Sequence, residues 1–250
     1  MKKYKPIELA RMFNLHPNSI RFYEEIGYIS KAKRKANNYR EFEEHHVLQL
    51  KICRYIFGYQ FTNSLIRNTG NLVIKSAVSR DLTVGKQYSF DYIHVIQNEI
   101  KIAKETASTL HLWANLVPKV VNDIDKNYTR NDIANLLGTT KESVRNWERN
   151  DLIQSNKVGS KNERLFDDLD LERIRIVYML RQTGYSISAI HRCLSAYDNG
   201  YKNLLLDKLN NPTQEELLSA GDCWLFELEK LENVAKKIPP IFEELKAIDY

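Results

Sequence analysis

The chain has 250 residues, of which 43% are hydrophobic and 28% are charged, and its formal net charge at pH 7 is +5. This composition is typical of a globular protein with two small cores, and the mild positive charge weakly favours a polyanionic partner. The polar N-terminus argues against a signal peptide, and the lack of ~20 consecutive apolar residues argues against a membrane span. The three cysteines are widely spaced, which argues against a disulfide framework and a metal cluster.

Two short helices are predicted at the start of the chain. Pro6 suits the first position of one helix, where the missing N–H would have no partner in any case. The buried face of this helix is expected to consist of Ile7, Leu9, Ala10 and Phe13. Pro17 begins a second helix that runs to about Ile26, and Gly27 ends it in a left-handed conformation. Two helices separated by about three residues indicate a helix-turn-helix.

A wing and two further helices follow in the prediction. Residues 30–42 have mixed polarity and suit a two-stranded wing, with four cations in the five residues of KAKRK at 31–35. A basic run alone is more often a solvated loop. A third helix is expected from about Glu43 to Phe57, and a shorter one from about Phe61. Together these elements form a first domain, expected over residues 1–75.

A long helix is predicted within residues 86–127. Its apolar residues recur in alternating steps of three and four, which is the spacing of a coiled-coil seam. The seam consists of Ile93, Ile96, Ile100, Ala103, Ala107, Leu110, Ala114 and Val117. Pro118 is expected to break or sharply kink the helix.

The chain then repeats itself. Residues 4–42 align without a gap on residues 128–166, at a constant offset of 124 (128 − 4). A repeat of this length indicates a duplicated domain, expected over residues 128–200. Thr129 and Thr140 are expected to cap its first two helices. Basic residues recur where the first wing has them, and this recurrence favours a functional role over a solvated loop.

A second tail is expected over residues 213–250. Its seam consists of Leu217, Gly221, Trp224, Leu228, Leu231, Ala235 and Ile238. Pro239 and Pro240 should break it. Small residues of one seam often align with larger residues of the other, as Ala103 does with Trp224. Two such helices can pack antiparallel.

These motifs resemble a known family. The stretches IELARMFNLHPNSIRFYEEIGYI and NNYREF are similar to the winged helix-turn-helix of the MerR family of bacterial transcription regulators. The similarity covers residues 4 to about 68, and a more diverged copy covers 128 to about 194. The second copy departs from the pattern where Asp151 replaces Gly27 and Glu163 replaces Tyr39. The resemblance implies a mainly α fold in which two winged helix-turn-helix domains each precede a long helix. The two helices would pair as an antiparallel coiled coil within one chain, as an intrachain pseudodimer.

The resemblance also implies which residues contact DNA. The expected contacts of the first head are His16, Asn18, Ser19, Arg21, Phe22 and Tyr23 on its recognition helix and Lys33, Arg34, Tyr39 and Arg40 on its wing. Those of the second head are Thr140, Glu142, Ser143, Arg145, Asn146 and Trp147 on its recognition helix and Lys157, Lys161 and Arg164 on its wing. Asn18 and Asn146 can pair with adenine, and Glu142 can accept a hydrogen bond from cytosine. Core packing is an equal alternative for Tyr23 and Trp147, and the preferred use of Ile20 and Val144.

A protein of this family is expected to be a sequence-specific regulator of double-stranded DNA in the bacterial cytoplasm, associated with the nucleoid. We expect an asymmetric operator of two half-sites, distortion of promoter DNA and RNA polymerase as a partner. The chain would act as a monomeric pseudodimer, with a homodimer as the other possibility. An excisionase-like architectural protein that bends DNA in a mobile element is the alternative function.

The sequence offers few signs of other chemistry. It has no paired carboxylates, nucleophile–base set, phosphate loop or metal spacing, so no enzymatic activity, cofactor or metal is expected. The EFEEHH stretch at 41–46 is expected to be a solvated first turn of a helix, enriched in acids because the helix dipole favours them. Trp113, Trp224 and Tyr92 can line an aromatic ligand site, but core packing is preferred.

Overall fold

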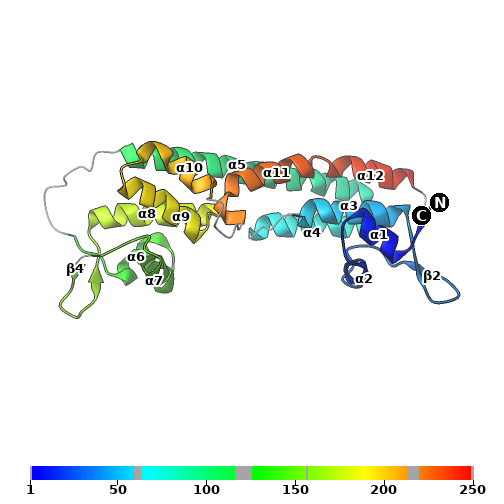
Figure 1. Cartoon of the computed structure of the whole chain (residues 1–250), viewed down its shortest axis with the longest axis horizontal. Coiled ribbons are helices and arrows are strands. Elements are labelled where there is room, and N and C mark those ends of the chain that lie inside the picture. The colour runs from blue at the N-terminus through cyan, green and yellow to red at the C-terminus, as the bar shows by residue number, and fades with distance from the viewer. Residues whose placement is uncertain (1, 59–62, 116–125, 156, 213–219, 249–250) are drawn as a thin grey trace. The chain divides into compact units, whose positions relative to one another are not determined.

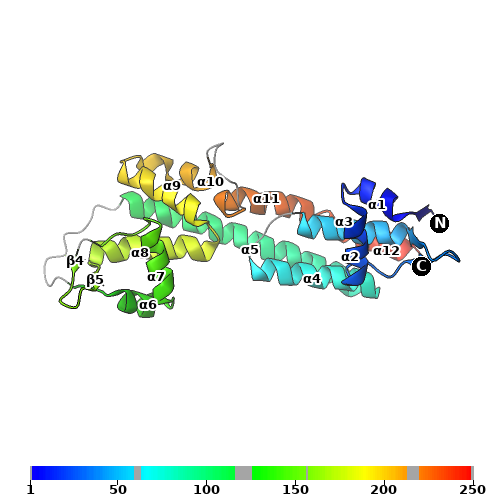
Figure 2. The ribbon, with the colours of Figure 1, turned by 60° about the horizontal axis from the view of Figure 1, so that its bottom comes forward.

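The computed structural model describes residues 2–58, 63–115, 126–155, 157–212 and 220–248. The chain forms two compact units, one made of Met1–Ile100 with Glu227–Tyr250 and the other of Lys101–Phe226. Both are mainly helical, and each contains one of the two predicted heads (Figures 1 and 2). Among the described helices, none combines the length and the apolar character needed to cross a bilayer.

The first head begins with the predicted helix-turn-helix. Its helices are α1 (Pro6–Met12) and α2 (Pro17–Glu25), and they precede α3 (Glu44–Phe57) and α4 (Ser64–Ser79). The wing strands are β2 (Lys33–Arg34) and β3 (Arg40–Glu43). A short β1 (Lys3–Tyr4) pairs antiparallel with β3, giving the order β1-β3-β2. The wing is therefore three-stranded, and α4 is longer than α3 where a shorter helix was predicted.

A single apolar core holds the first head together. Its completely or almost completely buried members are Leu9, Ile20, Ile29, Phe42 and Leu50. These side chains come from α1, α2, the turn after α2, β3 and α3, so the helix-turn-helix, the wing and the third helix share one core. Burial of an aliphatic or aromatic side chain of this kind contributes about 1.5–3 kcal/mol.

The second head repeats this arrangement. Its helices are α6 (Arg130–Leu137), α7 (Lys141–Arg149), α8 (Asp168–Thr183) and α9 (Ile187–Asp198), and its wing strands are β4 (Lys157–Val158) and β5 (Arg164–Leu165). The side chains of Thr129 and Thr140 accept hydrogen bonds from backbone N–H groups at the starts of α6 and α7, so both predicted caps are confirmed. Tyr128 pairs with Phe166 where the first head pairs Tyr4 with Phe42.

The two heads share their turn conformations even where the residues differ. Gly27 has φ +74°, and Asp151 at the matching position has φ +56°. Asn38 and Asn162 in the wing turns also have positive φ, at 63° and 58°. Asp and Asn tolerate the left-handed region better than most residues. The replacement of Gly27 by Asp151 therefore leaves the path of the backbone unchanged.

The second unit also contains elements without a predicted counterpart. A 3-10 helix, η1 (Lys202–Leu204), leads into α10 (Leu205–Asn210), which packs on α9, and another 3-10 turn, η2 (Ala220–Asp222), packs on α9 as well. Gly221 lies in η2, so it does not belong to the second tail helix as predicted. Leu217 lies outside the described residues.

The first tail helix is α5 (Leu82–Asn115). Its seam residues are buried except Ala107, which is half-buried, and Val117 and Pro118 lie outside the described residues. The second tail is divided into α11 (Trp224–Ala235) and α12 (Ile238–Ala247), with Pro239 and Pro240 in the first turn of α12. The predicted break at these prolines is confirmed.

Within the first unit, the second tail runs antiparallel to α5. Lys86 Nζ lies 2.7 Å from Glu243 Oε1, and Gln97 Nε2 donates to Glu232 Oε1 at 2.8 Å. Residue numbers therefore increase along α5 in the direction in which they decrease along the second tail. In addition, α12 packs on α3 of the first head (Figures 1 and 2). A continuous coiled coil along both seams stays a prediction, as do the bounds of the four predicted segments.

Candidate nucleic-acid interface

The first recognition helix, α2, presents a polar surface to solvent. Ile20 is completely buried, whereas Asn18, Arg21 and Phe22 are exposed. His16 is also exposed and caps the helix, because its Nδ1 accepts a hydrogen bond from the backbone N–H of Asn18 at 3.2 Å. The helix thus keeps its predicted core residue inside and offers donors, acceptors and one aromatic ring for base edges.

Two residues of α2 differ in their contacts with the rest of the head. Arg21 makes no side-chain hydrogen bond or ion pair with any residue in the described part of the chain. Tyr23 is half-buried, its ring centroid lies 6.2 Å from that of Tyr28, and burial raises its pKa. Ser19 is half-buried as well. Tyr23 therefore belongs partly to the core, and Arg21 remains available to a ligand.

Acidic residues of β3 balance the basic run of the first wing. Lys33 Nζ lies 3.0 Å from Glu43 Oε1, and Lys35 Nζ lies 2.9 Å from Glu41 Oε2. These lysines, together with Lys3 at Glu41, hold the pKa of both carboxyl groups below the usual range. The net positive charge of the wing is thus smaller than its sequence indicates.

The remaining predicted contacts of the first wing divide into paired and exposed residues. Arg34 donates to the Asn38 side chain at 3.1 Å, and the ring of Tyr39 is highly exposed. Arg40 does not extend freely, because its Nε lies 2.5 Å from Oε2 of Glu24 on α2. The wing arginine is therefore bound to the recognition helix.

The second recognition helix, α7, has a different surface. Val144 is completely buried, as predicted, and Asn146 is exposed. Glu142 lies 3.0 Å from Arg145 Nη1 and 3.6 Å from Arg149 Nη1. Thr140 and half-buried Ser143 form the capping contact at the start of the helix. Glu142 therefore forms ion pairs with both arginines of this helix, and the matching residue in the first head is the uncharged Asn18.

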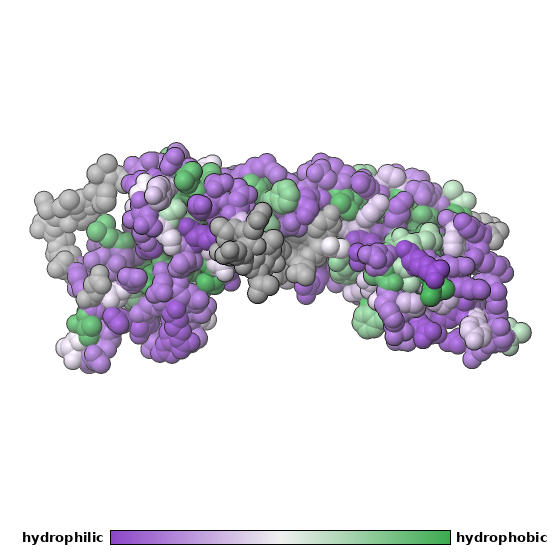
Figure 3. Space-filling model, in the orientation of Figure 1, coloured by the Kyte–Doolittle hydropathy of each residue, from purple (hydrophilic) through white to green (hydrophobic). Residues whose placement is uncertain are grey.

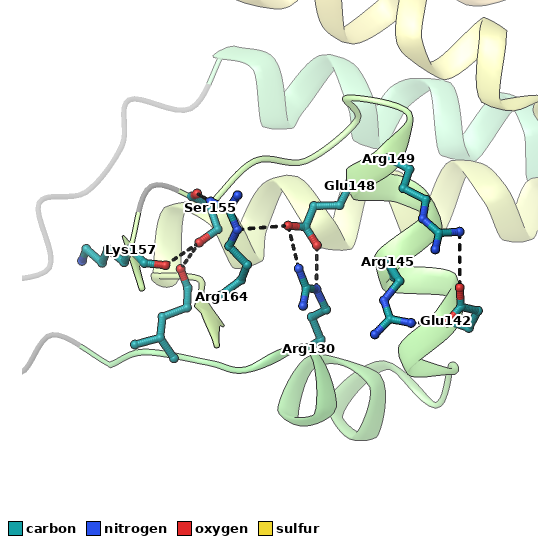
Figure 4. A network of polar contacts seen from close by, with 9 residues as sticks. Arg130, Glu142, Arg145, Glu148, Arg149, Ser155, Lys157 and Arg164 are labelled. Atoms are coloured by element: carbon teal, nitrogen blue, oxygen red, sulfur yellow. Dashed lines mark hydrogen bonds and ion pairs between the residues drawn. The ribbon is translucent and has the colours of Figure 1, made fainter. Parts of the chain in front are cut away.

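The second wing carries its own set of polar contacts (Figure 4). Arg164 donates from Nη1 to the Ser155 carbonyl oxygen at 2.9 Å, and its Nε lies 3.9 Å from Glu148 Oε1. Lys157 Nζ lies 3.6 Å from Asp167, and Lys161 is exposed. The surface over α6 and α7 is almost wholly hydrophilic in Figure 3.

Two families match these two heads. The family described as MerR family regulatory protein matches residues 5–42, and the one described as MerR HTH family regulatory protein matches residues 128–197. Both heads are therefore MerR-family domains. A curated relative, the mercuric resistance operon regulatory protein of Bacillus cereus, is 23% identical over 118 residues, which are 47% of this chain and 74% of that protein. No solved structure matches the chain. The protein is thus a MerR-type DNA-binding regulator.

One predicted DNA contact of the second MerR-family head is wrong. Trp147 is only 4% exposed, and its ring centroid lies 6.4 Å from that of Tyr178 on α8. A side chain this deeply buried cannot reach a groove without unpacking the head. Trp147 therefore packs in the core, which was the equal alternative in its prediction.

The predicted solvation of residues 41–46 is also wrong. Glu41, Glu43, His45 and His46 are all buried at the joint between the wing and α3. The imidazole rings of His45 and His46 lie 3.8 Å apart, and the Glu43 N–H donates to His46 Nδ1 at 3.0 Å. Burial lowers the pKa of both histidines, that of His45 to about 4. Burial therefore favours the neutral form of both rings, which are packed inside this MerR-family head.

The aromatic residues considered as a ligand site serve packing. Tyr92 and Trp224 are buried, and Trp113 stacks on Tyr197 at a centroid distance of 4.4 Å. Cys53 and Cys193 are buried, and burial raises the pKa of both thiols. No group of His, Cys, Asp and Glu among the described residues is arranged to hold a metal ion.

Sequence comparison of the two heads missed two arginines near the interface. Arg149 lies one turn beyond Arg145 on α7, and counting charges along the helix would have found it. Arg130 binds Glu148 with two hydrogen bonds, of 2.6 and 3.0 Å. Its counterpart in the first head is Pro6, so a search for residues shared by the two heads passes over it.

Proposed function

We propose that the chain is a transcription regulator that recognises an asymmetric operator with its two unlike heads. The single observation that carries this proposal is that one chain contains two complete helix-turn-helix heads whose exposed recognition residues differ. Asn18 and Phe22 in the first head stand where Glu142 and Asn146 stand in the second. Because base edges present distinct donor and acceptor patterns in the major groove, different side chains favour different half-sites.

Selection of bound duplexes from a random pool by the full chain tests this proposal. We expect enrichment of one sequence with two unlike half-sites. Changing Asn18 to Ala should relax base preference in one half-site, and changing Asn146 to Ala should relax it in the other. Enrichment of a palindrome, or relaxation of the same half-site by both changes, would contradict an asymmetric operator.

We further propose that the bound protein distorts promoter DNA and so controls access by RNA polymerase. The antiparallel contacts of α5 with α11 and α12, and the packing of α12 on α3, support a rigid connection to at least the first head. Bending a site costs on the order of 1–6 kcal/mol, which loosely connected heads could not impose.

A flexible Gly/Ser insertion between Asp125 and Tyr128 tests this mechanism. The insertion should leave most of the affinity for a duplex with both half-sites but abolish the change in end-to-end distance, measured by fluorescence transfer between dyes at the duplex ends. Transcription from a promoter with the same site in its spacer should fall with the distortion. Unchanged transcription would indicate simple occlusion. A preferred site beside a recombination sequence would instead favour the architectural function.

A further inference from the structure

The same acid on the two recognition helices has a different partner in each head. Glu24 and Glu148 occupy matching positions near the ends of α2 and α7, and Arg40 and Arg164 occupy matching positions on the wings. The third member of the second set, Arg130, has Pro6 as its counterpart. This difference changes which wing arginine keeps its charge for another ligand.

In the first head, both carboxylate oxygens of Glu24 have partners within the protein. One oxygen, Oε2, lies 2.5 Å from Arg40 Nε, and the other, Oε1, accepts a hydrogen bond from the Ala32 N–H at 3.0 Å. The side chain of Arg40 is 23% exposed and that of Glu24 only 10%. The charge of Arg40 is thus cancelled by a close and largely buried partner.

In the second head, Arg130 takes both oxygens of Glu148. Its Nε lies 2.6 Å from Oε2, and its Nη2 lies 3.0 Å from Oε1, which is the two-pronged geometry of a strong arginine–carboxylate pair. The pairing with Glu148 raises the pKa of Arg130. Arg164 is left 3.9 Å from the same carboxylate, with its side chain half exposed. Figure 4 shows both arginines beside Glu148.

We propose that Arg130 is a positioning residue that releases the wing arginine of the second head for a DNA phosphate. With Glu148 neutralised by Arg130, the set Glu148, Arg130 and Arg164 carries a net charge of +1 (−1 + 1 + 1). The matching pair in the first head, Glu24 and Arg40, carries none (−1 + 1). Arg164 therefore contacts phosphate as a full charge, and Arg40 chiefly ties its wing to α2.

This inference rests on the proposed function, and the salt dependence of DNA binding tests it. The slope of log K against log salt concentration is negative, and each phosphate neutralised by a protein cation adds about 0.9 to its magnitude, which is the slope value compared below. The full chain and its variants are titrated with one duplex selected by the wild type. We expect Arg164→Ala to lower the slope by about 0.9 and Arg40→Ala to lower it by less than half as much. Arg164→Lys should restore most of the loss.

Variants of Arg130 distinguish positioning from direct contact. Without Arg130, Glu148 is free to capture Arg164, so Arg130→Ala should lower the slope as much as Arg164→Ala does, and the double variant should show no further loss. In a Glu148→Gln background, Arg130→Ala should leave the slope unchanged, because the capturing acid is gone. If circular dichroism shows that Arg130→Ala alone does not fold, the same comparison is made with Glu148→Gln and with the double variant Glu148→Gln, Arg130→Ala.

Two results would overturn the role of Arg130. One is equal slope losses for Arg40→Ala and Arg164→Ala; the other is additive losses for Arg130→Ala and Arg164→Ala, which would mean that Arg130 touches DNA itself. If the wild-type chain selects no duplex at all, the proposed function fails instead. The two failures are therefore separate observations.

Discussion

At the scale of single residues, the two heads keep the same acid on the recognition helix and surround it with different cations. Glu24 and Glu148 survive the duplication, while the partner changes from Arg40 to Arg130. The same holds at the helix start, where Asn18 gives way to Glu142 and Glu142 binds Arg145. The two heads therefore differ more in electrostatics than in backbone.

The sequence predicted buried positions better than pairings. Ile20 and Val144 fall inside both heads because helical periodicity places them on the apolar face. Periodicity predicts the face of the helix on which a side chain lies but not how deeply neighbouring elements bury it. It therefore could not decide whether Trp147 packs in the core or contacts the DNA groove. Ion pairs such as Arg130 with Glu148 join residues 18 positions apart, and their formation depends on how α6 and α7 pack.

The contrast between Arg21 and Arg145 leads to a prediction about DNA affinity. Arg21 is free within the described structure, whereas Arg145 lies 3.0 Å from Glu142 and must leave or share this partner to contact DNA. Arg21→Ala should therefore cost about 1–3 kcal/mol of binding free energy, and Arg145→Ala less. Fluorescence anisotropy with a duplex of both half-sites measures the difference. Lys101→Ala on α5 is the control, and equal losses at the two arginines would refute the argument.

The two buried histidines predict how stability depends on pH. An unfolded histidine has a pKa near 6.5, and His45 in the folded head has one of about 4, because burial and then the neighbouring His46 disfavour its charge. Glu43 acts in the opposite sense, and Lys33 and Arg80 reinforce the lowering. As pH falls through this window the unfolded state takes up the proton first, so folding free energy is lost between pH 6.5 and 4.

Denaturant unfolding at pH 7 and pH 5 measures this loss, which should be about 1–2 kcal/mol for His45. Replacement of His45 by Gln should flatten the dependence in this range, and replacement of exposed His94 by Gln should not. The acids Glu41 and Glu43, whose pKa values are lowered by lysines, stabilise the head above their unfolded pKa of 4.5 and lose that effect only at lower pH. A pH-independent stability from 7 to 5 would rule out the buried-histidine account.

At the scale of elements, the sequence predicted long amphipathic helices well and short pieces poorly. The seam of α5 and the break before α12 follow from periodicity and from proline chemistry. The strand β1 has two residues, too few for an alternating pattern to appear. Gly221, which was predicted to belong to the second seam, lies instead in a 3-10 turn that packs on α9, and this tertiary contact leaves no periodic signal in the sequence.

Gly85 on α5 shows why one small residue is needed where the tail meets the first head. A Cβ at this position would lie 2.3 Å from the Phe242 ring of α12 and 2.9 Å from Ser76 Cβ of α4. Gly85→Ala gains about 0.5–1 kcal/mol of helix propensity. The overpacking costs about 1–3 kcal/mol. The expected result is net destabilisation, since neighbours on two sides must move.

Thermal unfolding of Gly85→Ala measures this balance. Addition of Phe242→Leu should recover part of the loss, because a smaller side chain gives the new methyl group room. Asn98→Ala, an exposed change on the same helix, should be neutral or slightly stabilising. A stabilised Gly85→Ala protein would show that the contact with Phe242 is loose.

At the scale of the whole molecule, the first unit is built from both ends of the chain. Helix α12, which belongs to the second repeat, packs on α3 of the first head, and Lys86 of the first tail binds Glu243 of the second. If these contacts were made between two copies of the chain, they would join the copies as a homodimer. In the first unit they are made within one chain, so this part of the tail surface is already covered.

This covering predicts a monomer. Seam residues such as Ile96 and Leu110 have no exposed surface in the single chain, so a partner helix could gain little by burying them again. Light scattering at low micromolar concentration should give the mass of one chain, 29.3 kDa, and one chain should saturate one duplex with two half-sites. Exposed Phe90 on α5 offers a check, since Phe90→Ser should leave the mass unchanged. A stable dimer, with or without this change, would mean that the tails pair between chains and that the two half-sites are shared by two proteins.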